Sequence, residues 1–289
     1  MNNNHTIHHY FFISALATIF TLGCLWGAIN LLLIGFEESF HGIDYSWVLA
    51  HGHAMVFGFV GLFIMGFSYR ALPHFMKTTL WKPKLALSTL PIMIFGILLQ
   101  AYAHVIAPRQ PYLLLGISAG IIQIIAVVIF ALVIARTMQS ATTRGSSAGL
   151  SIAALGWFLI AAILNPVIFW LFESPSTQEE FLFNVSSFNI PYRDIQTLGI
   201  AVMMILGVSL HILPHAYGFR EPTKRWRNFL LWGVNGAILF GVISFTAGMT
   251  TGVHWWHAAN GITYIILLVA AIGTPIQFRL FSKIGRAHV

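Results

Sequence analysis

Long apolar stretches separated by short polar ones fill this chain of 289 residues. About 20 mostly apolar residues are enough for a helix to cross a bilayer. Backbone amides in hydrocarbon have no water to bond, so such a stretch must be helical. Eight stretches are long enough: 10–36, 46–71, 85–107, 112–136, 149–172, 193–213, 228–249 and 255–277. The pattern predicts an all-α, polytopic membrane helix bundle with eight transmembrane helices.

Composition and charge agree with a membrane protein. Hydrophobic residues make up 57% of the chain and charged residues 8%, whereas a soluble domain carries about 25% charged residues. Thirteen of the fifteen Lys and Arg follow even-numbered spans or lie near the C-terminus, and seven of the eight acids lie in the opposite loops. This is the positive-inside bias. We therefore interpret the net charge of +7 as a topology signal and not as a sign of nucleic-acid binding. It places the N-terminus in the cytoplasm and the chain in the inner (cytoplasmic) membrane.

A short repeat at an offset of 141 residues predicts two similar halves. The sequence Ala-Leu-Pro-His at 71–74 matches Ile-Leu-Pro-His at 212–215. Two glycine pairs keep the same offset: Gly58 with Gly199, and Gly66 with Gly207. An even number of spans in each half makes the halves parallel. Chance similarity between apolar helices is the alternative.

The repeat also predicts the domain organisation. We expect a first four-helix unit at 1–138, a cytoplasmic linker at 139–148 and a second four-helix unit at 149–283. The last residues, 284–289, resemble a translated sequencing adapter, so we expect a non-native tail. An ordinary polar tail is the alternative. If the tail is non-native, the natural chain continues past Lys283, as it would in a truncated twelve-helix protein.

Histidine is the residue type that carries candidate chemistry. Neutral imidazole is the commonest metal ligand and an axial ligand of haem iron, and ionisable groups in spans are candidates for function. Five of the thirteen histidines lie at the predicted outer ends of three spans: His51, His53, His104, His254 and His257. We take all five as candidate cofactor-binding residues, and the first and the last two as candidate metal ligands.

Helix geometry limits how these histidines combine. His254 and His257 are three residues apart, so they share a face within about 60° and could hold one metal ion. His51 and His53 are about 200° apart on a helix. Both can therefore bind one centre only if the helix starts at or after His51.

The sequence also predicts a hydrogen-bond partner for His104, and it predicts that other histidines are interfacial residues without a ligand role. Gln100 lies one turn from His104 and could orient its imidazole. For any single histidine, the alternative is a polar residue tolerated at the membrane interface. We favour that interpretation for His41, His74 and His215.

Other kinds of site lack support. Cys24 is the only cysteine, which excludes a disulfide within the chain, a thiolate cluster and a Cys-x-x-Cys-His haem attachment. The sequence contains no Ser-His-Asp order and no Gly-rich phosphate loop. Catalytic residues therefore stay unassigned.

The stretch His-Gly-His-Ala-Met-Val-Phe-Gly-Phe at 51–59 resembles the signature of the NnrS family of haem- and copper-containing membrane proteins, which is linked to nitric oxide metabolism. The stretch 51–73 also resembles the second helix of haem-copper oxidase subunit I, in the nitric oxide reductase and cbb3-type branches. There, a histidine near the outer end ligates the low-spin haem. The resemblance implies that His51 is a haem ligand.

Two departures from these families bear on activity. Ala54 stands where NnrS-like proteins usually carry Glu. The His-Pro-Glu-Val-Tyr helix and the His-His pair of the oxidase copper site are missing from the sixth and seventh spans. If the chain is an enzyme, it would be a haem-copper-type oxidoreductase, but its catalytic copper-site motifs are missing.

The first functional hypothesis is a haem-binding, or haem–copper, integral membrane protein of respiratory or nitric oxide metabolism. It would hold a non-covalent b-type haem near the outer membrane face, with His51 as an axial ligand and His104 lining the site. His254 or His257 would lie opposite His51 or at a metal. An electron donor, other respiratory subunits or a small diatomic gas would be partners beside the lipid bilayer. The alternatives are a cofactor-free transporter or proton relay and a metal-free structural subunit.

Overall fold

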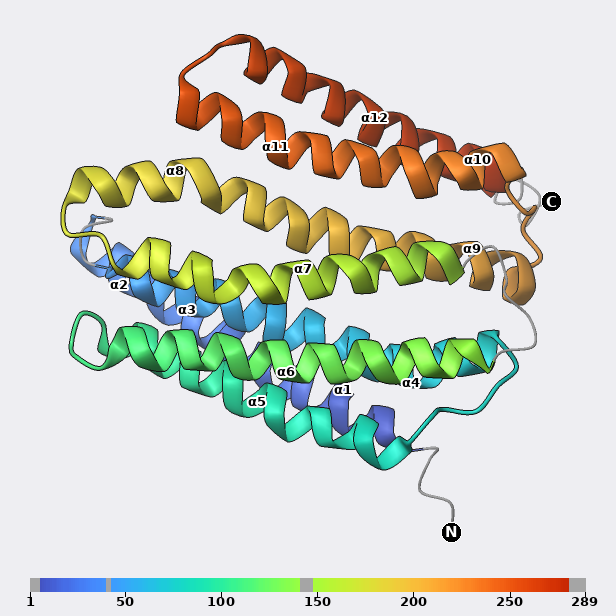
Figure 1. Cartoon of the computed structure of the whole chain (residues 1–289), viewed down its shortest axis with the longest axis horizontal. Helices are drawn as coiled ribbons and strands as arrows, with labels where there is room; N and C mark the ends of the chain where they lie inside the picture. The colour runs from blue at the N-terminus through green and yellow to red at the C-terminus, as the bar shows by residue number, and fades with distance from the viewer. Residues whose placement is uncertain (1–5, 40–42, 141–147, 281–289) are drawn as a thin grey trace. The chain divides into compact units, whose positions relative to one another are not determined.

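The computed structural model describes residues 6–39, 43–140 and 148–280 (Figure 1). Within these ranges, eight helices are long and apolar enough to span a membrane. They are Ile7–Glu37, Tyr45–Phe75, Pro83–Ile106, Tyr112–Gln139, Ala148–Glu173, Gln178–Tyr217, Lys224–Thr251 and Trp255–Phe278. The described ranges contain no strand. The prediction of an all-α, multi-pass helix bundle is confirmed.

Four of these spans are composite, because each contains a short π-helix. The first consists of α1 (Ile7–Thr18), η2 (Ile19–Leu25) and α2 (Trp26–Glu37), and the second of α3 (Tyr45–His53), η4 (Ala54–Gly61) and α4 (Leu62–Phe75). The sixth consists of α8 (Gln178–Asp194), η5 (Ile195–Val202) and α9 (Met203–Tyr217), and the seventh of α10 (Lys224–Asn228), η6 (Phe229–Val234) and α11 (Asn235–Thr251). The remaining spans are α5 (Pro83–Ile106), α6 (Tyr112–Gln139), α7 (Ala148–Glu173) and α12 (Trp255–Phe278).

Local sequence sets where several of these helices begin and end. The side chain of Asp44 accepts a hydrogen bond of 3.0 Å from the backbone N–H of Ser46, which caps the start of α3. Pro83 occupies the first turn of α5, where its missing N–H costs nothing. Gly218 and Gly252 end α9 and α11 with φ of 61° and 68°, a left-handed conformation that glycine adopts without strain.

The sixth span starts earlier than the apolar pattern predicts, at Gln178 instead of residue 193. Thr177 Oγ1 accepts a hydrogen bond from the N–H of Glu180, and the Glu180 carboxyl accepts one from the N–H of Ser176. This Thr-x-x-Glu pattern is a helix-capping box. The segment 178–192 contains too many polar residues for the apolar pattern to include it in a span. The residues at its start nevertheless stabilise the first turn of a helix.

The chain divides into two compact units. Unit 1 consists of Met1–Arg144 and Leu159–Phe181, and unit 2 of Gly145–Phe158 and Leu182–Val289. The boundary runs through α7, which gives its first half to unit 2 and its second half to unit 1. Residues 141–147 of the predicted linker, the predicted tail at 284–289, and His41 lie outside the described residues. The division into two four-helix units stays a prediction.

In unit 1 the first two spans pack closely through small residues. A Cβ on Gly27 would lie 2.9 Å from the His51 ring, and one on Gly23 would lie 2.7 Å from Met55 Sδ. Glycine permits this approach because it carries no side chain. Along the interface the contacts pair Gly27 with His51, Gly23 with Met55, Thr18 with Gly58, and Phe11 with Gly66. Residue numbers fall on one helix as they rise on the other, so the spans are antiparallel.

Unit 2 repeats this contact between the first half of α7 and the sixth span. A Cβ on Gly199 would lie 2.7 Å from the Trp157 ring, and one on Gly207 would lie 2.8 Å from the backbone nitrogen of Ser151. These glycines correspond to Gly58 and Gly66 of the sequence repeat. The π-helices η4 and η5 begin and end at that same offset of 141 residues. The internal structure of the units supports the repeat, while their parallel arrangement stays a prediction.

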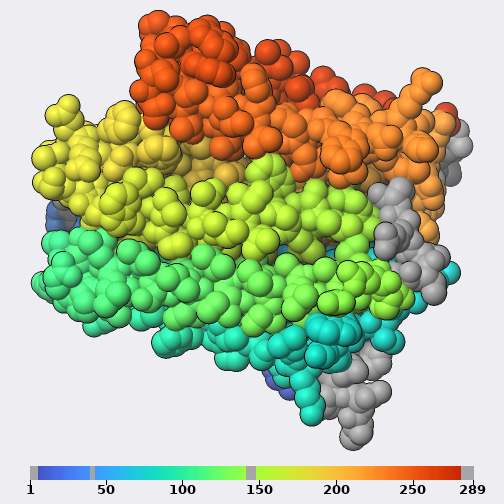
Figure 2. Space-filling model, in the orientation of Figure 1, coloured from blue at the N-terminus to red at the C-terminus, as the bar shows by residue number. Residues whose placement is uncertain are grey.

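Apolar side chains fill the core and also cover the outside of the helices. In the core of unit 1, the Tyr69 ring meets Phe11 and Phe130 edge-on at centroid distances of 5.3 and 5.2 Å. On the outside, α6 runs along the face of unit 1 seen in Figure 2. Its exposed side chains include Leu114, Ile121, Ile125, Val128 and Leu132. A soluble protein rarely exposes such a surface, whereas lipid chains cover it without cost, so the bilayer is the natural environment of this fold.

Candidate functional site

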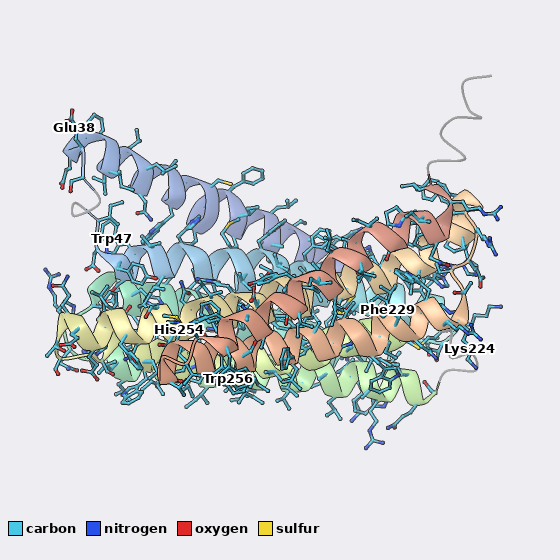
Figure 3. All side chains as sticks on the ribbon, turned by 90° about the horizontal axis from the view of Figure 1, so that it is seen from above. Glu38, Trp47, Lys224, Phe229, His254 and Trp256 are labelled. Atoms are coloured by element: carbon cyan, nitrogen blue, oxygen red, sulfur yellow. The ribbon has the colours of Figure 1, made fainter. Side chains whose placement is uncertain are left out.

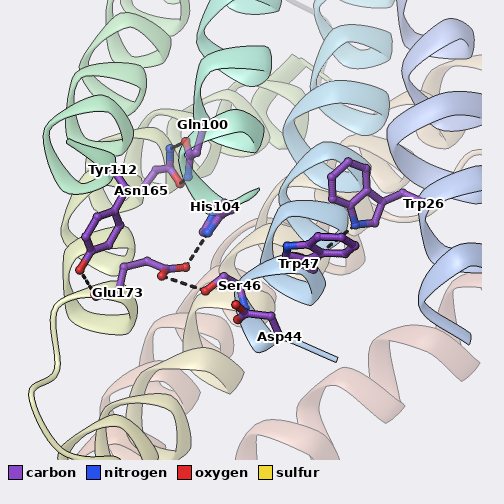
Figure 4. A network of polar contacts seen from close by, with 9 residues as sticks. All are labelled: Trp26, Asp44, Ser46, Trp47, Gln100, His104, Tyr112, Asn165 and Glu173. Atoms are coloured by element: carbon purple, nitrogen blue, oxygen red, sulfur yellow. Dashed lines mark hydrogen bonds and ion pairs between the residues drawn. The ribbon is translucent and has the colours of Figure 1, made fainter. Parts of the chain in front are cut away.

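Polar side chains gather at one end of unit 1, where α5 and α7 end and α3 and α6 begin (Figure 4). We call this the Glu173 end. His104 Nδ1 lies 2.7 Å from Glu173 Oε1, and both side chains are at most 5% exposed. The Ser46 hydroxyl donates to Glu173 Oε2 at 2.9 Å, and the Tyr112 hydroxyl donates to the Glu173 backbone carbonyl at 2.8 Å. Glu173 therefore connects all four helices at this end.

The hydrogen bonds define the chemical form of the His104–Glu173 pair. Both oxygens of Glu173 accept hydrogen bonds, as an ionised carboxylate does. His104 Nδ1 must then carry the proton, which in the neutral imidazole leaves the lone pair on Nε2. A histidine that binds a metal usually donates its other ring N–H to such a carboxylate, which fixes the ring and raises its basicity. The pair therefore suits a ligand role for His104.

A buried cluster of amides lies one helical turn below His104. Gln100 and Asn165 exchange two hydrogen bonds of 2.7 and 3.1 Å, and Gln123 Nε2 donates to Gln100 Oε1 at 2.8 Å. All three side chains are at most 2% exposed. Gln100 thus bonds to other amides, and Glu173 takes the orienting role that the sequence assigned to Gln100. Gln123 Oε1 is buried with no hydrogen-bond partner among the described residues.

His51 lies on a different side of α3 and faces the first span. Its Nδ1 lies 3.0 Å from the Gly23 carbonyl oxygen, and its ring packs against Gly27. A carbonyl oxygen only accepts, so Nδ1 donates and the lone pair stays on Nε2. His51 therefore has the tautomer that a haem ligand requires, and its ring occupies space left by Gly27.

His53 points away from His51. It lies seven residues after Ser46, so the two share a face of α3, the one that meets Glu173. Its ring is stacked on Phe57 at a centroid distance of 4.8 Å, and the residue is 5% exposed. The different directions of His51 and His53 follow from their spacing of two residues.

His254 and His257 belong to unit 2. His254 lies near the junction of α11 and α12, whereas Lys224 and Phe229 lie toward the other end of the seventh span (Figure 3). His254 is the N-cap residue of α12, and the His257 ring packs against Gly248 of α11. Both histidines are exposed. In the described ranges no three His, Cys, Asp or Glu side chains form a group that could hold a metal ion.

Four members of the Glu173 end and its amide cluster were not predicted from the sequence: Glu173, Ser46, Tyr112 and Gln123. One signal was present for Glu173, because both Glu173 and His104 close apolar spans at the same predicted depth. Gln123 and Asn165 are isolated polar residues within apolar spans. Burying an amide without a hydrogen bond is costly, so such residues are expected to pair with other polar groups. Which amides pair depends on how each helix is rotated about its own axis. Apolar residues cover most faces of these spans, so their periodicity does not predict that rotation.

Comparison with known proteins gives no family assignment. No family model matches the chain, and no curated protein or solved structure does. The likeness of residues 51–59 to the NnrS signature is therefore one basis for a proposal and not an identification.

Proposed function

We propose that this chain is a multi-pass membrane protein that binds non-covalent haem b through His51 or His104 of unit 1, as a redox or gas-binding component of respiratory or nitric oxide metabolism. One observation carries the proposal. In both His51 and His104, Nδ1 donates to an oxygen of the fold, so Nε2 keeps the lone pair that binds iron. A histidine that ligates haem iron contributes one imidazole, so a three-residue metal cluster is not needed.

The two imidazoles suit different roles. His51 is the candidate axial ligand from the resemblance to NnrS and oxidase helices, and the Gly23 carbonyl fixes its ring. His104 is the candidate from the structure, because the buried Glu173 carboxylate fixes its ring and its tautomer. They lie on different sides of α3, so the proposal treats them as alternative ligands. A bound haem would supply an iron able to exchange electrons or take a diatomic gas.

Copper is the second metal of the proposal. His254 and His257 are three residues apart at the start of α12, where two imidazoles can share one ion. The positive-inside rule predicts that this end of α12 faces the outside, where an electron donor would reach it. The same charge pattern supports our proposal that the chain lies in the inner membrane with its N-terminus in the cytoplasm.

Absorption spectra of the detergent-purified protein, oxidised and reduced, test the proposal. We expect a haem Soret band and a reduced α-band, with iron detected by metal analysis. Replacing the ligand should remove both bands, so His51→Ala and His104→Ala are compared. His74→Ala is the matched control, because His74 is exposed at the opposite end of the second span. A colourless protein without iron or copper would refute haem binding. If both His51→Ala and His104→Ala keep the haem bands, neither histidine is the haem ligand.

The buried amides favour one alternative function, a proton relay or transport path without cofactor. Gln100, Asn165 and Gln123 continue the polar line from His104 toward the middle of the spans, and Gln123 Oε1 is free to accept a further hydrogen bond from water or substrate. Buried polar groups in a membrane often mark such a path. The spectra separate the two functions, because a relay of this kind is colourless.

A further inference from the structure

Two histidines at the last turn of α9 are used by neither function above. His211 and His215 are four residues apart, so they lie on one face of the helix. Their rings are nearly parallel, with centroids 4.5 Å apart and an angle of 19° between planes. His211 is half-buried and His215 is exposed. The pair belongs to unit 2 and lies at the end that the charge pattern predicts to be cytoplasmic.

Hydrogen bonding prepares His215 to bind a cation. Its Nδ1 lies 2.8 Å from the backbone carbonyl oxygen of His211. The carbonyl only accepts, so Nδ1 carries the proton and Nε2 keeps its lone pair. The helix therefore fixes both the tautomer and the ring position of His215, which lowers the cost of ordering it around a metal.

The position on the helix also favours positive charge. α9 ends at Gly218, where the N–H groups of Gly218 and Phe219 bond back to the carbonyls of Pro214 and Leu213. The C-terminal end of a helix carries a partial negative charge, which stabilises cations in the last turn. An imidazole pair at this place thus combines two nitrogen donors with a favourable field.

We propose that His211 and His215 form a two-histidine site for a divalent transition-metal ion, with water completing the coordination. Two imidazoles spaced i, i+4 on one helix face form the metal-binding half of the H-E-x-x-H motif. Cu²⁺ suits nitrogen and oxygen ligands in a tetragonal arrangement and binds them more tightly than Zn²⁺ does. The site is independent of haem, because it lies in unit 2 and shares no residue with the Glu173 end.

The sequence repeat supplies a matched control inside the same chain. At the offset of 141 residues, His215 corresponds to His74 and His211 to Arg70. The equivalent turn of α4 therefore has one histidine and one arginine. An arginine side chain has no lone pair with which to bind a metal ion. This turn should bind no copper, and Arg70→His should rebuild the pair there.

Copper binding to the full chain tests the proposal. Protein in detergent is stripped with a chelator and titrated with Cu²⁺, with bound copper measured after dialysis and nitrogen ligation by electron paramagnetic resonance. His211→Ala and His215→Ala should each bind about one copper fewer per chain, or bind it at least about tenfold more weakly. His74→Ala should equal the wild type, and Arg70→His should bind about one copper more. Equal copper binding by the wild type and both alanine variants, or no gain in Arg70→His, would overturn the proposal.

Discussion

At the residue scale, the carboxylate of Glu173 is the group that connects the polar side chains at this end of unit 1. Its side chain is 5% exposed, and its two oxygens hold His104 and Ser46. A buried carboxylate is costly unless it is paired and hydrogen-bonded. The fold satisfies that need with one donor from α3 and one from α5. A function that uses His104 therefore depends on this carboxylate.

Removing the Glu173 carboxylate should destabilise unit 1. In Glu173→Ala the buried Nδ1–H of His104 loses its acceptor, which costs about 1–3 kcal/mol. The half-buried hydroxyl of Ser46 loses its acceptor as well. We expect a lower free energy of unfolding, measured by denaturation in detergent. Glu37→Ala is the control, because Glu37 is exposed at the end of α2 and should change stability by less than about 0.5 kcal/mol. Equal stability of the two variants would show that the buried pair contributes nothing.

How much of this site the sequence predicts depends on the kind of contact. The candidate residue His104 and its depth follow from the apolar pattern, because both need only the length of the span. Its partner Glu173 is 69 residues away in sequence, and Ser46 is 127 residues from Glu173. Such contacts depend on which helices are neighbours and how each is rotated. Hydropathy alone carries neither kind of information when both faces of a helix are apolar.

At the element scale, glycines set how closely neighbouring spans approach. The repeat predicted Gly58, Gly66, Gly199 and Gly207 as equivalent positions, and in the structure each faces the preceding span of its own unit. Membrane helices associate through close packing at small residues, because lipid gives them no hydrophobic drive to pair. The π-helices η4 and η5 were not predicted, since no local residue pattern marks a wider turn.

Enlarging Gly207 should separate two helices of unit 2. A Cβ there would lie 2.6 Å from Ser151 Oγ and 2.8 Å from the Ser151 backbone nitrogen, and the backbone cannot move aside cheaply. Gly207→Ala should therefore lower the free energy of unfolding by about 1–3 kcal/mol, the usual cost of overpacking. Gly156 lies in the same pair of helices with nothing within 4 Å of a Cβ. Gly156→Ala should thus be neutral or stabilising by about 0.5–1 kcal/mol. Thermal unfolding of both variants in one detergent compares them, and equal losses would argue against the tight contact.

At the scale of the whole molecule, the charge distribution predicts on which side of the membrane each helix end lies. The packing of the helices does not determine this. Eight helices can span a bilayer in either direction, and the internal contacts of both units are the same in both. The excess of Lys and Arg on one side breaks that symmetry. The charge pattern thus predicts that the Glu173 end of unit 1 faces the outside, where partners would reach it.

Cysteine labelling of intact cells tests this orientation directly. Cys24 is the only cysteine, so Cys24→Ser gives a background without thiols. Into it are placed Arg109→Cys, in the exposed loop between α5 and α6, and Lys84→Cys, exposed in the first turn of α5. A membrane-impermeant maleimide should label the cysteine at 109 in intact cells and the one at 84 only after permeabilisation. The two positions bracket one helix, so each is the control for the other. The reverse pattern would put the N-terminus outside and the proposed haem site at the cytoplasmic face, where an electron donor on the outside could not reach it.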